Sequence, residues 1–326
     1  MNVPASSSSE LWVITTYFNF VRYERRLANY RHFRKHIGAP LLTVELAKEG
    51  EFVLKEGDAD ILIQCSDGDV MWQKERLLNH GLSRLPESCR YVAWVDCDLL
   101  FHDPGWIERA VKELQRVPLL QPFNRVVHAS REARVSRFEV NPEWVAQPAM
   151  GAALAERGSF EGFMRAVMRR AAGTPASGMA WVARREVLER HGWYDASIIG
   201  GGDTALVCAA FNRPEIVVEL HHLNARQREY YQDWALRFHN DVQERVSCIS
   251  GTVLHLWHGE LSDRMPQERH RGLREHQFDP QRDIALGKDG AWRWATDKPA
   301  MHRYLRRYFA SRLEDGSPEG RVVNMP

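Results

Sequence analysis

Apolar runs of strand length alternate with amphipathic stretches through the first part of the chain. Four runs rich in Val, Ile, Leu and aromatic residues predict strands that are apolar on both faces: residues 11–16, 40–46, 60–65 and 90–95. Between them, residues 21–37 place apolar side chains at helical intervals, and residues 72–80 predict a helix that Gly81 ends. Strands that alternate with helices in this way are typical of an α/β fold with a mainly parallel sheet covered on both sides.

The pattern is less regular after about residue 115. Residues 118–148 combine prolines, arginines and short apolar runs, which predicts strands and loops laid across a sheet edge. A further strand over 178–183 is followed by a helix over 185–191, and three glycines then precede a helix over 204–211. The segment from about residue 260 onward is rich in Arg, Glu and Gln and predicts helices, among them one over 301–312.

These changes in pattern divide the chain into four parts. Residues 1–10 contain four consecutive serines and predict a disordered tail without the pattern of a signal peptide. Residues 11–115 and 116–260 predict two halves of one α/β domain, and residues 261–326 predict a helical C-terminal extension. Because no run approaches the roughly 18 uninterrupted apolar residues of a membrane span, a soluble cytoplasmic protein is expected.

The composition is that of an ordinary globular protein. Of the 326 residues, 44% are hydrophobic and 27% are charged, which excludes a fibrous or wholly disordered chain. The 44 Lys and Arg residues nearly balance the 43 Asp and Glu residues, so no global charge draws the chain to nucleic acid or anionic lipid. Five scattered cysteines without a Cys-x-x-Cys pair argue against a disulfide framework and against a cysteine zinc site.

Three Asp-x-Asp pairs are candidate sites for a divalent cation, because two neighbouring carboxylates can share one ion. Asp58-Ala-Asp60 precedes its strand and is interpreted as a solvated turn. Asp67-Gly-Asp69 follows a strand, where a turn and a ligand-binding loop are equally compatible with the sequence. Asp96 and Asp98 end the most apolar strand, at the edge where an open α/β sheet binds ligands. A cation would offset the cost of burying both carboxylates, and a capped turn is the alternative interpretation.

His255 and His258 lie three residues apart in the sequence His-Leu-Trp-His-Gly. At helical spacing or around a turn, both imidazoles can face one ion, and neutral imidazole is a common ligand of divalent transition metals. Together with Asp98 they would form a site of mixed oxygen and nitrogen ligands, which suits Mn²⁺ or Mg²⁺ better than a structural zinc. A core histidine hydrogen-bonded to the backbone is the alternative interpretation.

Asp203 follows three glycines, Gly200 to Gly202, and precedes a predicted helix. Glycines let the backbone approach a ligand closely, and the helix dipole favours a carboxylate at the start of a helix. A simple helix cap is the alternative, but three glycines are more than a cap requires. Asp203 is therefore a candidate general base that could deprotonate an acceptor hydroxyl.

The order of these motifs resembles that of the GT-A-type glycosyltransferases, in particular the β-1,4-galactosyltransferase group and family-2-like bacterial and phage enzymes. Four segments within roughly residues 11–270 carry the resemblance. They are Lys74–Asn79 followed by Gly81, the Asp96-Cys-Asp98 motif, the stretch from Ser177 to Asp203, and His255–His258. The resemblance implies a Rossmann-like GT-A fold in which residues 11–115 bind a nucleotide sugar and residues 116–260 complete the metal and acceptor sides.

The resemblance also implies a role for each motif. Asp98, His255 and His258 would bind Mn²⁺ or Mg²⁺, with His255 in place of a methionine, and Asp96 would contact the ion or the ribose. The cation would neutralise the diphosphate of a nucleotide-sugar donor, with a UDP-sugar expected. Asp203 would take the proton of the acceptor hydroxyl in a displacement that inverts the anomeric carbon. Further donor-binding candidates are Trp72, Lys74, Arg264 and Arg269, although a lysine on a helix is more often solvated.

The acceptor side is expected near a group of aromatic and glycine residues: Trp181, Trp193, Tyr194, Gly201 and Gly202. Aromatic faces stack on sugars or bases, with core packing as the alternative. Gly202 and Ile199 stand where the galactosyltransferases have a glutamate and a tryptophan, so acceptor specificity does not carry over. A glycan or glycolipid is the expected acceptor. A hydroxymethylated base in DNA, suggested by the phage-like resemblance, would need a basic surface from the arginine-rich runs 22–34 and 264–274.

Two other classes of protein remain open. A nucleotidyltransferase also uses paired carboxylates on a parallel sheet, but it would need a glycine-rich phosphate loop after the first strand, and residues 15–26 contain no glycine. A non-catalytic sugar-binding protein would have no use for a base. Replacing Asp203 with Asn should then leave its donor binding intact.

Overall fold

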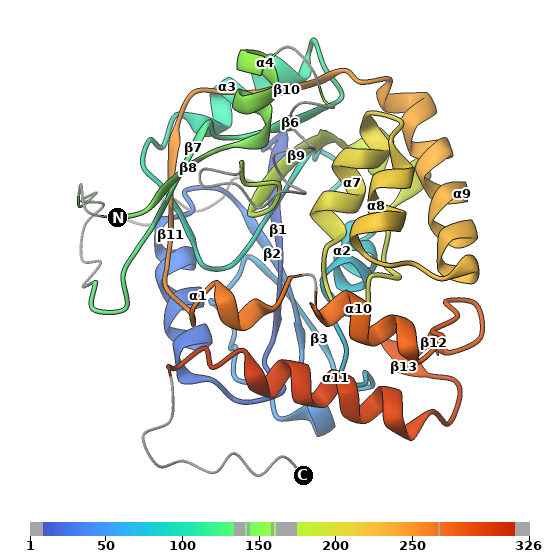
Figure 1. The fold of residues 1–326 in the computed structure, drawn as a ribbon. Coiled ribbons are helices and arrows are strands. Elements are labelled where there is room, and N and C mark those ends of the chain that lie inside the picture. The colour runs from blue at the N-terminus through green and yellow to red at the C-terminus, as the bar shows by residue number, and fades with distance from the viewer. Residues whose placement is uncertain are drawn as a thin grey trace.

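The fold is α/β, as predicted, with helices on both faces of a large central sheet (Figure 1). This computed structural model describes residues 9–133, 141, 144–157, 160, 175–266 and 268–316, without the side chains of residues 154–157. The tail predicted over residues 1–10 therefore lies outside the described residues, apart from Ser9 and Glu10.

The central sheet has seven strands in the order β10-β6-β9-β4-β1-β2-β3. In chain order these strands are β1 (Leu11–Phe18), β2 (Leu41–Leu46), β3 (Ile61–Cys65), β4 (Tyr91–Val95), β6 (Leu119–Gln121), β9 (Ala180–Arg184) and β10 (Val246–Cys248). All neighbouring strands are parallel except that β9 runs antiparallel to both β4 and β6. The sheet is thus mainly parallel, as the unbroken apolar runs predicted.

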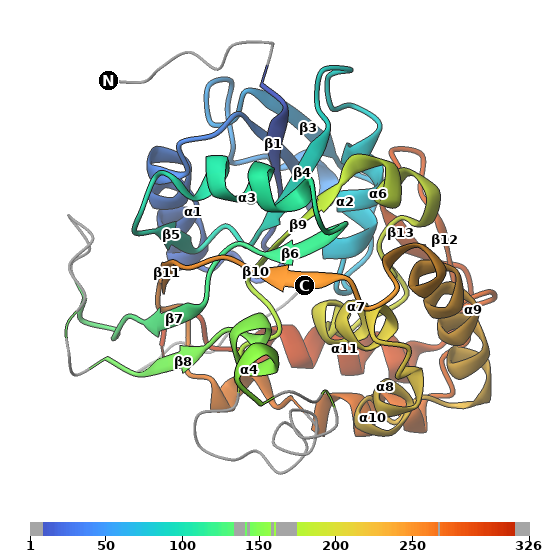
Figure 2. The same ribbon diagram turned by 90° about the horizontal axis from the view of Figure 1, so that it is seen from above.

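Helices cover both faces of this sheet, which explains why the sequence of β1 is apolar throughout. All eight residues of β1 are buried. Trp12 and Ile14 face one core cluster, whereas Leu11 and Val13 face the other, in the alternation that a strand imposes. The first cluster includes residues of α2 (Lys74–Leu82), α6 (Arg185–His191), α7 (Gly202–Ala210) and α9 (Ala225–Val242), and the second includes residues of α1 (Glu24–His36) and α3 (Trp106–Leu114) (Figure 2).

Gly81 does not end α2, contrary to the prediction, because the helix continues to Leu82. A β-carbon at Gly81 would lie 2.8 Å from Cγ2 of Val44 and 2.9 Å from Cδ1 of Ile14. The glycine therefore serves the close approach of α2 to β1 and β2 and not the end of the helix. This approach fixes the position of α2, whose first residue is Lys74.

A second sheet has four strands in the order β5-β11-β7-β8. These are β5 (Leu99–Phe101), β7 (Arg125–His128), β8 (Ala146–Pro148) and β11 (Thr252–His255). The region 118–148 was expected at a sheet edge. Of its three strands, β6 lies inside the central sheet, between β9 and β10, whereas β7 and β8 belong to the second sheet. The second sheet positions two candidate metal ligands, because Asp98 directly precedes β5 and His255 is the last residue of β11.

The C-terminal part contains α10 (Glu268–Glu275) and α11 (Pro299–Ser311), and also a hairpin that the sequence did not predict, formed by β12 (Ile284–Leu286) and β13 (Trp292–Trp294). Shorter helices complete the described fold: α4 (Met150–Arg157), α8 (Pro214–Leu220), and the 3₁₀ helices η1 (Lys48–Gly50) and η2 (Ser262–Arg264). None of the described helices combines the length and the apolar character needed to cross a membrane.

Two of the three Asp-x-Asp pairs hold the backbone in place. Asp58 accepts a hydrogen bond from the backbone N–H of Lys55 in the turn before β3, as predicted, and Asp60 accepts one from the backbone N–H of Leu41 at the start of β2. Asp67 and Asp69 accept hydrogen bonds from the backbone of the β12–β13 hairpin, at Lys288 and Trp294. The Asp67-Gly-Asp69 pair therefore fastens this hairpin.

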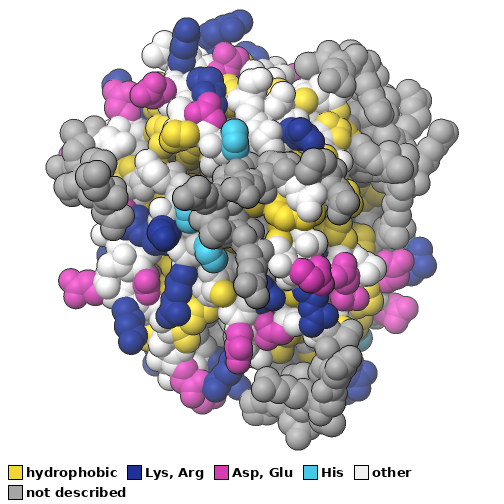
Figure 3. Space-filling view, turned by 90° about the vertical axis from the view of Figure 1, so that its left-hand side faces the viewer, with side chains coloured by type: hydrophobic (Ala, Val, Ile, Leu, Met, Phe, Trp, Pro, Cys, Tyr) yellow, Lys and Arg dark blue, Asp and Glu magenta, His cyan; other side chains and the backbone are white. Residues whose placement is uncertain are grey.

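On the face that carries α1, positive and negative side chains are interspersed over the described surface (Figure 3).

Candidate active site

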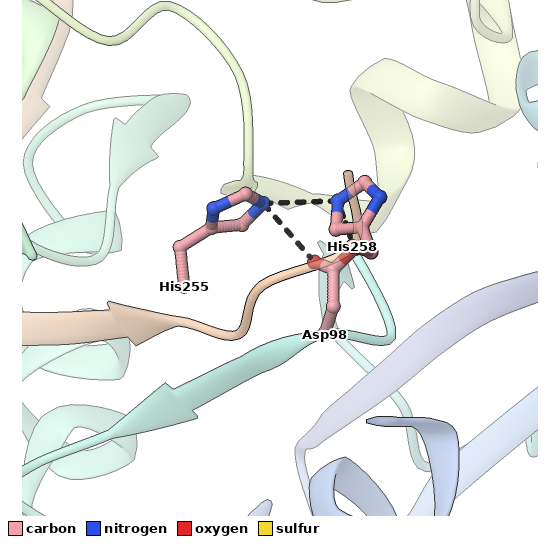
Figure 4. Close-up of side chains that lie close together, drawn as sticks. All are labelled: Asp98, His255 and His258. Atoms are coloured by element: carbon pink, nitrogen blue, oxygen red, sulfur yellow. Dashed lines mark hydrogen bonds and ion pairs between the residues drawn. The ribbon is translucent and has the colours of Figure 1, made fainter. Parts of the chain in front are cut away.

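The ends of two strands bring Asp98 and His255 together. Asp98 directly precedes β5, and His255 is the last residue of β11, which pairs antiparallel with β5 so that His255 lies opposite Leu99. The backbone N–H of Leu256 donates a hydrogen bond to the carbonyl of Asp98, 2.8 Å away, which extends the pairing beyond the strands. The chain then turns so that the ring of His258 meets the other two side chains (Figure 4).

Asp98, His255 and His258 form a group able to hold one metal ion, with their ligand atoms all within 4.8 Å of one another. Nε2 of His258 lies 2.9 Å from Oδ2 of Asp98, and Nε2 of His255 lies 3.2 Å from Nε2 of His258 (Figure 4). The Oδ1 atom of Asp98 is buried and has no hydrogen-bond partner within the described part of the chain. A cation would satisfy this oxygen, and two imidazoles with one carboxylate are a suitable ligand set for a divalent transition metal.

Burial and neighbouring charges set the protonation of this group. Burial lowers the pKa of His255 well below its ordinary value, so the ring is neutral and keeps a lone pair for a cation. Burial alone would raise the pKa of Asp98, but His258, His255 and Arg264 lower it below its ordinary value. At neutral pH the site therefore offers an ionised carboxylate next to the neutral ring of His255.

Three polar side chains surround the two imidazoles. Nδ1 of His255 lies 3.0 Å from Nδ1 of His128, at the end of β7. Nδ1 of His258 lies 3.8 Å from Oε2 of Glu314, a buried carboxylate that also ion-pairs with two arginines. Nη2 of Arg264 lies 2.8 Å from Nε2 of His258. A ligand that binds to Nε2 of His258 would therefore displace the guanidinium of Arg264 from this nitrogen.

Lys74 is buried between two carboxylates, whereas a lysine on a helix was expected to be solvated. Only 6% of the residue is exposed. Its Nζ atom lies 2.7 Å from Oδ1 of Asp96 and 3.1 Å from Oδ2 of Asp203. Burial lowers the pKa of Lys74, but the two carboxylates raise it above its ordinary value, so the ammonium stays charged. Asp96 was expected to contact the ion or the ribose; it pairs with Lys74 and, among the described residues, lies outside the metal-binding group.

Lys74→Met should destabilise the protein by about 3 kcal/mol, because it leaves two carboxylates close together without their shared cation. This value is at the low end for a broken buried pair, since the side chains of Asp96 and Asp203 are 33% and 21% exposed and keep some hydration. Urea denaturation of the variant and the wild type measures the difference. Lys112→Met, at an exposed position of α3, is the matched control. Equal stability of the two variants would contradict the role given to Lys74.

A glycine turn aims Asp203 at the cavity. Gly200 and Gly201 have φ angles of 89° and 98°, a region that side chains other than glycine rarely adopt. Gly201 is the residue before α7, and Asp203 is the second residue of that helix. Backbone conformation therefore requires two of the three glycines in this segment. A simple helix cap would not need them, so the turn favours a further role for Asp203.

Buried side chains support this turn from behind. His221 and His270 stack with ring centroids 4.0 Å apart, and a β-carbon at Gly201 would lie 2.6 Å from Cε1 of His221. Burial lowers the pKa of His221 to about 3. A β-carbon at Gly202 would overlap Oε1 of Glu75, and burial raises the pKa of Glu75 to about 8. Gly202, expected on the acceptor side, instead makes room for Glu75 and does not line the described cavity.

A cavity of about 440 Å³ joins these features. The metal-binding group lines it together with Lys74, Asp96, Gly201 and Asp203. Trp72 also lines the cavity, with the guanidinium carbon of Arg312 5.4 Å from its ring centroid. Four arginines contribute positive charge to the lining: Arg26, Arg264, Arg269 and Arg312. The predicted donor-side residues thus share one space with the predicted base.

Trp181, Trp193 and Tyr194 are core residues, which corrects their expected place at the acceptor side. They are 0%, 3% and 5% exposed, and none belongs to the described lining of the cavity. Trp193 packs edge-on against Trp94, and Tyr194 packs edge-on against Tyr231. Because these three side chains are almost wholly buried, they offer no exposed ring face on which a sugar could stack.

The sequence did not predict five residues that support or line the site: Arg26, Glu75, His128, Arg312 and Glu314. Arg26 of α1 and Glu314 show why, since their side chains lie 2.9 Å apart although 288 positions separate them in the chain. Such a pair leaves no periodicity or spacing that a sequence pattern could reveal. Only the fold brings these residues to the site.

No protein-family model matches this chain, and no curated protein matches its sequence. The similar solved structures include S. aureus TarS in complex with UDP-GlcNAc, with 9% identity, 94% of this chain and 74% of that chain covered, and a TM-score of 0.39. Glucosyl-3-phosphoglycerate synthase from Mycobacterium tuberculosis, in complex with Mn²⁺, UDP and phosphoglyceric acid, has 14% identity, 89% of each chain covered and a TM-score of 0.41. A mutant of Drosophila β1,4-galactosyltransferase 7, in complex with manganese, UDP-Gal and xylobiose, has 10% identity, 91% and 99% covered, and a TM-score of 0.39. Similarity at this level does not assign a function. A functional assignment rests instead on the side chains described above.

Proposed function

We propose that this chain is a metal-dependent glycosyltransferase that moves a sugar from a nucleotide-diphosphate sugar, with a UDP-sugar expected, to an acceptor hydroxyl. The observation that carries the proposal is one cavity lined both by the metal-binding group and by Asp203. Transfer from such a donor needs positive charge at the leaving diphosphate and a base at the acceptor. The cavity offers side chains for both tasks.

The metal-binding end of the cavity is suited to the diphosphate. Mn²⁺ or Mg²⁺ held by Asp98, His255 and His258 would supply Lewis-acid stabilisation of the charge that grows on the leaving group. Two imidazole ligands favour Mn²⁺ over the harder Mg²⁺. Arg264, which now donates to Nε2 of His258, would turn to the diphosphate when that nitrogen binds a cation. Arg269 of the same lining, whose Nη1 donates to the hydroxyl of Tyr308, is proposed to contact the second phosphate.

Asp203 is the proposed base. The acceptor oxygen forms a bond to the anomeric carbon while the bond from that carbon to the diphosphate oxygen breaks, and the acceptor proton passes to the Asp203 carboxylate. One such displacement inverts the anomeric carbon. Lys74 and the glycine turn support this role, because they hold the carboxylate at the cavity wall. Asp96 is proposed to anchor Lys74, and Trp72 to contact the nucleoside.

A donor-hydrolysis screen tests this function without knowledge of the acceptor. The purified protein is incubated with UDP-, GDP-, TDP- and ADP-sugars in the presence of Mn²⁺, Mg²⁺ or EDTA, and release of the nucleoside diphosphate is measured. We expect slow hydrolysis of at least one UDP-sugar with Mn²⁺, and none with EDTA. Absence of release from every donor, together with no donor binding by calorimetry, would overturn the proposal.

The products of the same screen separate the other two classes. When pyrophosphate is added, a nucleotidyltransferase would cleave the nucleotide sugar between its two phosphates, giving a nucleoside triphosphate and a sugar 1-phosphate, and would release no nucleoside diphosphate. A sugar-binding protein would bind the donor and leave it intact even after long incubation. The proposal requires cleavage between the sugar and the diphosphate.

A carbohydrate acceptor is favoured over DNA. The arginines of the run 22–34 are largely committed within the protein, as shown by the ion pairs of Arg26 with Glu314 and Arg34 with Asp60. On the face that carries α1, acidic side chains are interspersed with the basic ones (Figure 3). DNA binding relies on a continuous basic surface. Salt-sensitive retention on a DNA column would therefore argue for the DNA acceptor and against a carbohydrate.

A further inference from the structure

A row of polar side chains crosses the second sheet and ends at the metal-binding group. β11 lies between β5 and β7, and β8 follows β7 at the edge of the sheet. In this register His255 lies opposite His128, and Gln147 of β8 pairs with Val126 of β7. Nδ1 of His128 lies 3.0 Å from Nδ1 of His255, and Nε2 of His128 lies 3.2 Å from Oε1 of Gln147. The contacts form one continuous chain from β8 to the candidate metal site.

The chemistry of these atoms fixes the direction of each hydrogen bond. In this orientation of the Gln147 amide its oxygen faces His128 and accepts, so Nε2 of His128 carries the hydrogen. In a neutral imidazole the other nitrogen, Nδ1 of His128, is then an acceptor. The hydrogen between the two rings must therefore be on Nδ1 of His255. This assignment leaves Nε2 of His255 with a free lone pair, and that atom faces Asp98 and His258 (Figure 4).

We propose that His128, oriented by Gln147, is a positioning residue that holds His255 in the tautomer whose bare Nε2 can bind the cation. The inference rests on the proposed metal site. In water the two tautomers of an imidazole interconvert, and the form with hydrogen on Nε2 cannot ligate through that atom. The hydrogen bond from His128 removes this competing form and also fixes the angle of the ring. His128 and Gln147 also line the cavity, but the proposed role of His128 acts through His255.

The ring of His258 has a similar orientation, although no hydrogen bond holds its Nδ1 atom within the described residues. Its Nδ1 atom faces Oε2 of Glu314 at 3.8 Å, while its Nε2 atom faces Asp98. Both rings thus direct Nε2 at the site and Nδ1 at a polar partner behind it. This shared orientation is the arrangement in which two histidines can bind one ion through the same type of nitrogen.

The first test is the tautomer of His255, which needs no metal. Long-range ¹H–¹⁵N correlation spectra of histidine-labelled protein, recorded in EDTA, report which ring nitrogen carries the hydrogen. The wild type should show His255 protonated at Nδ1. His128→Phe keeps a ring but removes the acceptor, and Gln147→Leu removes the group that orients His128, so both should shift His255 towards the Nε2–H form. Gln147→Glu retains an acceptor and should keep the wild-type tautomer.

The second test is the affinity for Mn²⁺, measured by calorimetry. His128→Phe should weaken binding by about 10–100-fold, as loss of an outer hydrogen bond to a metal-ligating histidine does. His36→Phe, at an exposed position of α1, is the matched control and should bind like the wild type. If His128→Phe does not fold, as judged by circular dichroism, Gln147→Leu at the edge strand decides the question.

The outcomes separate this inference from the function on which it rests. Wild-type protein that binds no Mn²⁺ would refute the proposed metal site, while the tautomer spectra would still decide the role of His128. An Nδ1–H tautomer that persists in both His128→Phe and Gln147→Leu, with unchanged Mn²⁺ affinity, would overturn the inference even for an active enzyme. A weakened affinity that Gln147→Glu does not share supports it.

Discussion

Asp203→Asn should lower kcat by about 10²–10⁴-fold, the range typical for loss of a general base. Asn has nearly the same shape as Asp but does not accept a proton at neutral pH, so the acceptor hydroxyl would have to attack without proton removal. The KM for the donor and the Mn²⁺ affinity should stay close to wild type, because Asp203 is not part of the metal-binding group. Steady-state kinetics with the donor found in the hydrolysis screen measures kcat and KM.

A matched control for this variant is Asp233→Asn, an exposed carboxylate on α9 that ion-pairs with Arg237. It removes the same charge far from the glycine turn and should leave kcat unchanged. Because Asp203 also contacts Lys74, thermal unfolding of Asp203→Asn is measured in parallel to exclude a general loss of folded protein. A folded Asp203→Asn variant with wild-type kcat would show that another group takes the proton.

His258→Ala should reduce the affinity for Mn²⁺ by at least about 100-fold, beyond the effect of losing an outer-shell partner. His258 lies closest to both other members of the group, with distances of 2.9 Å to Asp98 and 3.2 Å to His255. The remaining carboxylate and imidazole lie 3.9 Å apart and offer only two protein ligands. Titration with Mn²⁺ followed by electron paramagnetic resonance measures the free ion directly. Nucleoside diphosphate release should fall with metal occupancy.

The corresponding control is His36→Ala on the surface of α1, which removes one imidazole but no proposed ligand. Excess Mn²⁺ should partly restore donor hydrolysis to His258→Ala, because weakened binding can be overcome by concentration. It should not restore Asp203→Asn, whose defect is in proton transfer. Identical Mn²⁺ affinities of His258→Ala and wild type would mean that the ion binds elsewhere or not at all.

The sequence was sufficient to predict the first parallel strands of the central sheet and the convergence of Asp98, His255 and His258, because both leave local signals. A buried parallel strand needs an unbroken apolar run, and β1, β2 and β4 have one. Asp98 stands directly after such a run, and the two histidines are close neighbours in the chain. The hairpin over 284–294 lacks this signal, since its strands have three residues each and only Ile284 among them is buried.

The sequence was not sufficient where a side chain has two common environments. A lysine at the start of a helix is usually solvated, and only the meeting of α2 with Asp96 and Asp203 shows that Lys74 is buried. Trp181 and Trp193 are equally compatible with a sugar platform and with a core, until packing shows both rings enclosed. His128 stands in no motif, and its partner His255 is 127 positions away, joined to it only by strand pairing.

Glu314 follows the other members of the site late in the chain, so it is the last of them to be synthesised. Its carboxylate lies behind His258 and pairs with Arg26 near the other end of the described chain. During synthesis on a ribosome, Asp98 and both imidazoles emerge well before this carboxylate does. A nascent chain that already contains the three candidate ligands therefore still lacks the group behind His258. The complete surroundings of His258 are therefore expected to form only after the last part of the described chain has been synthesised.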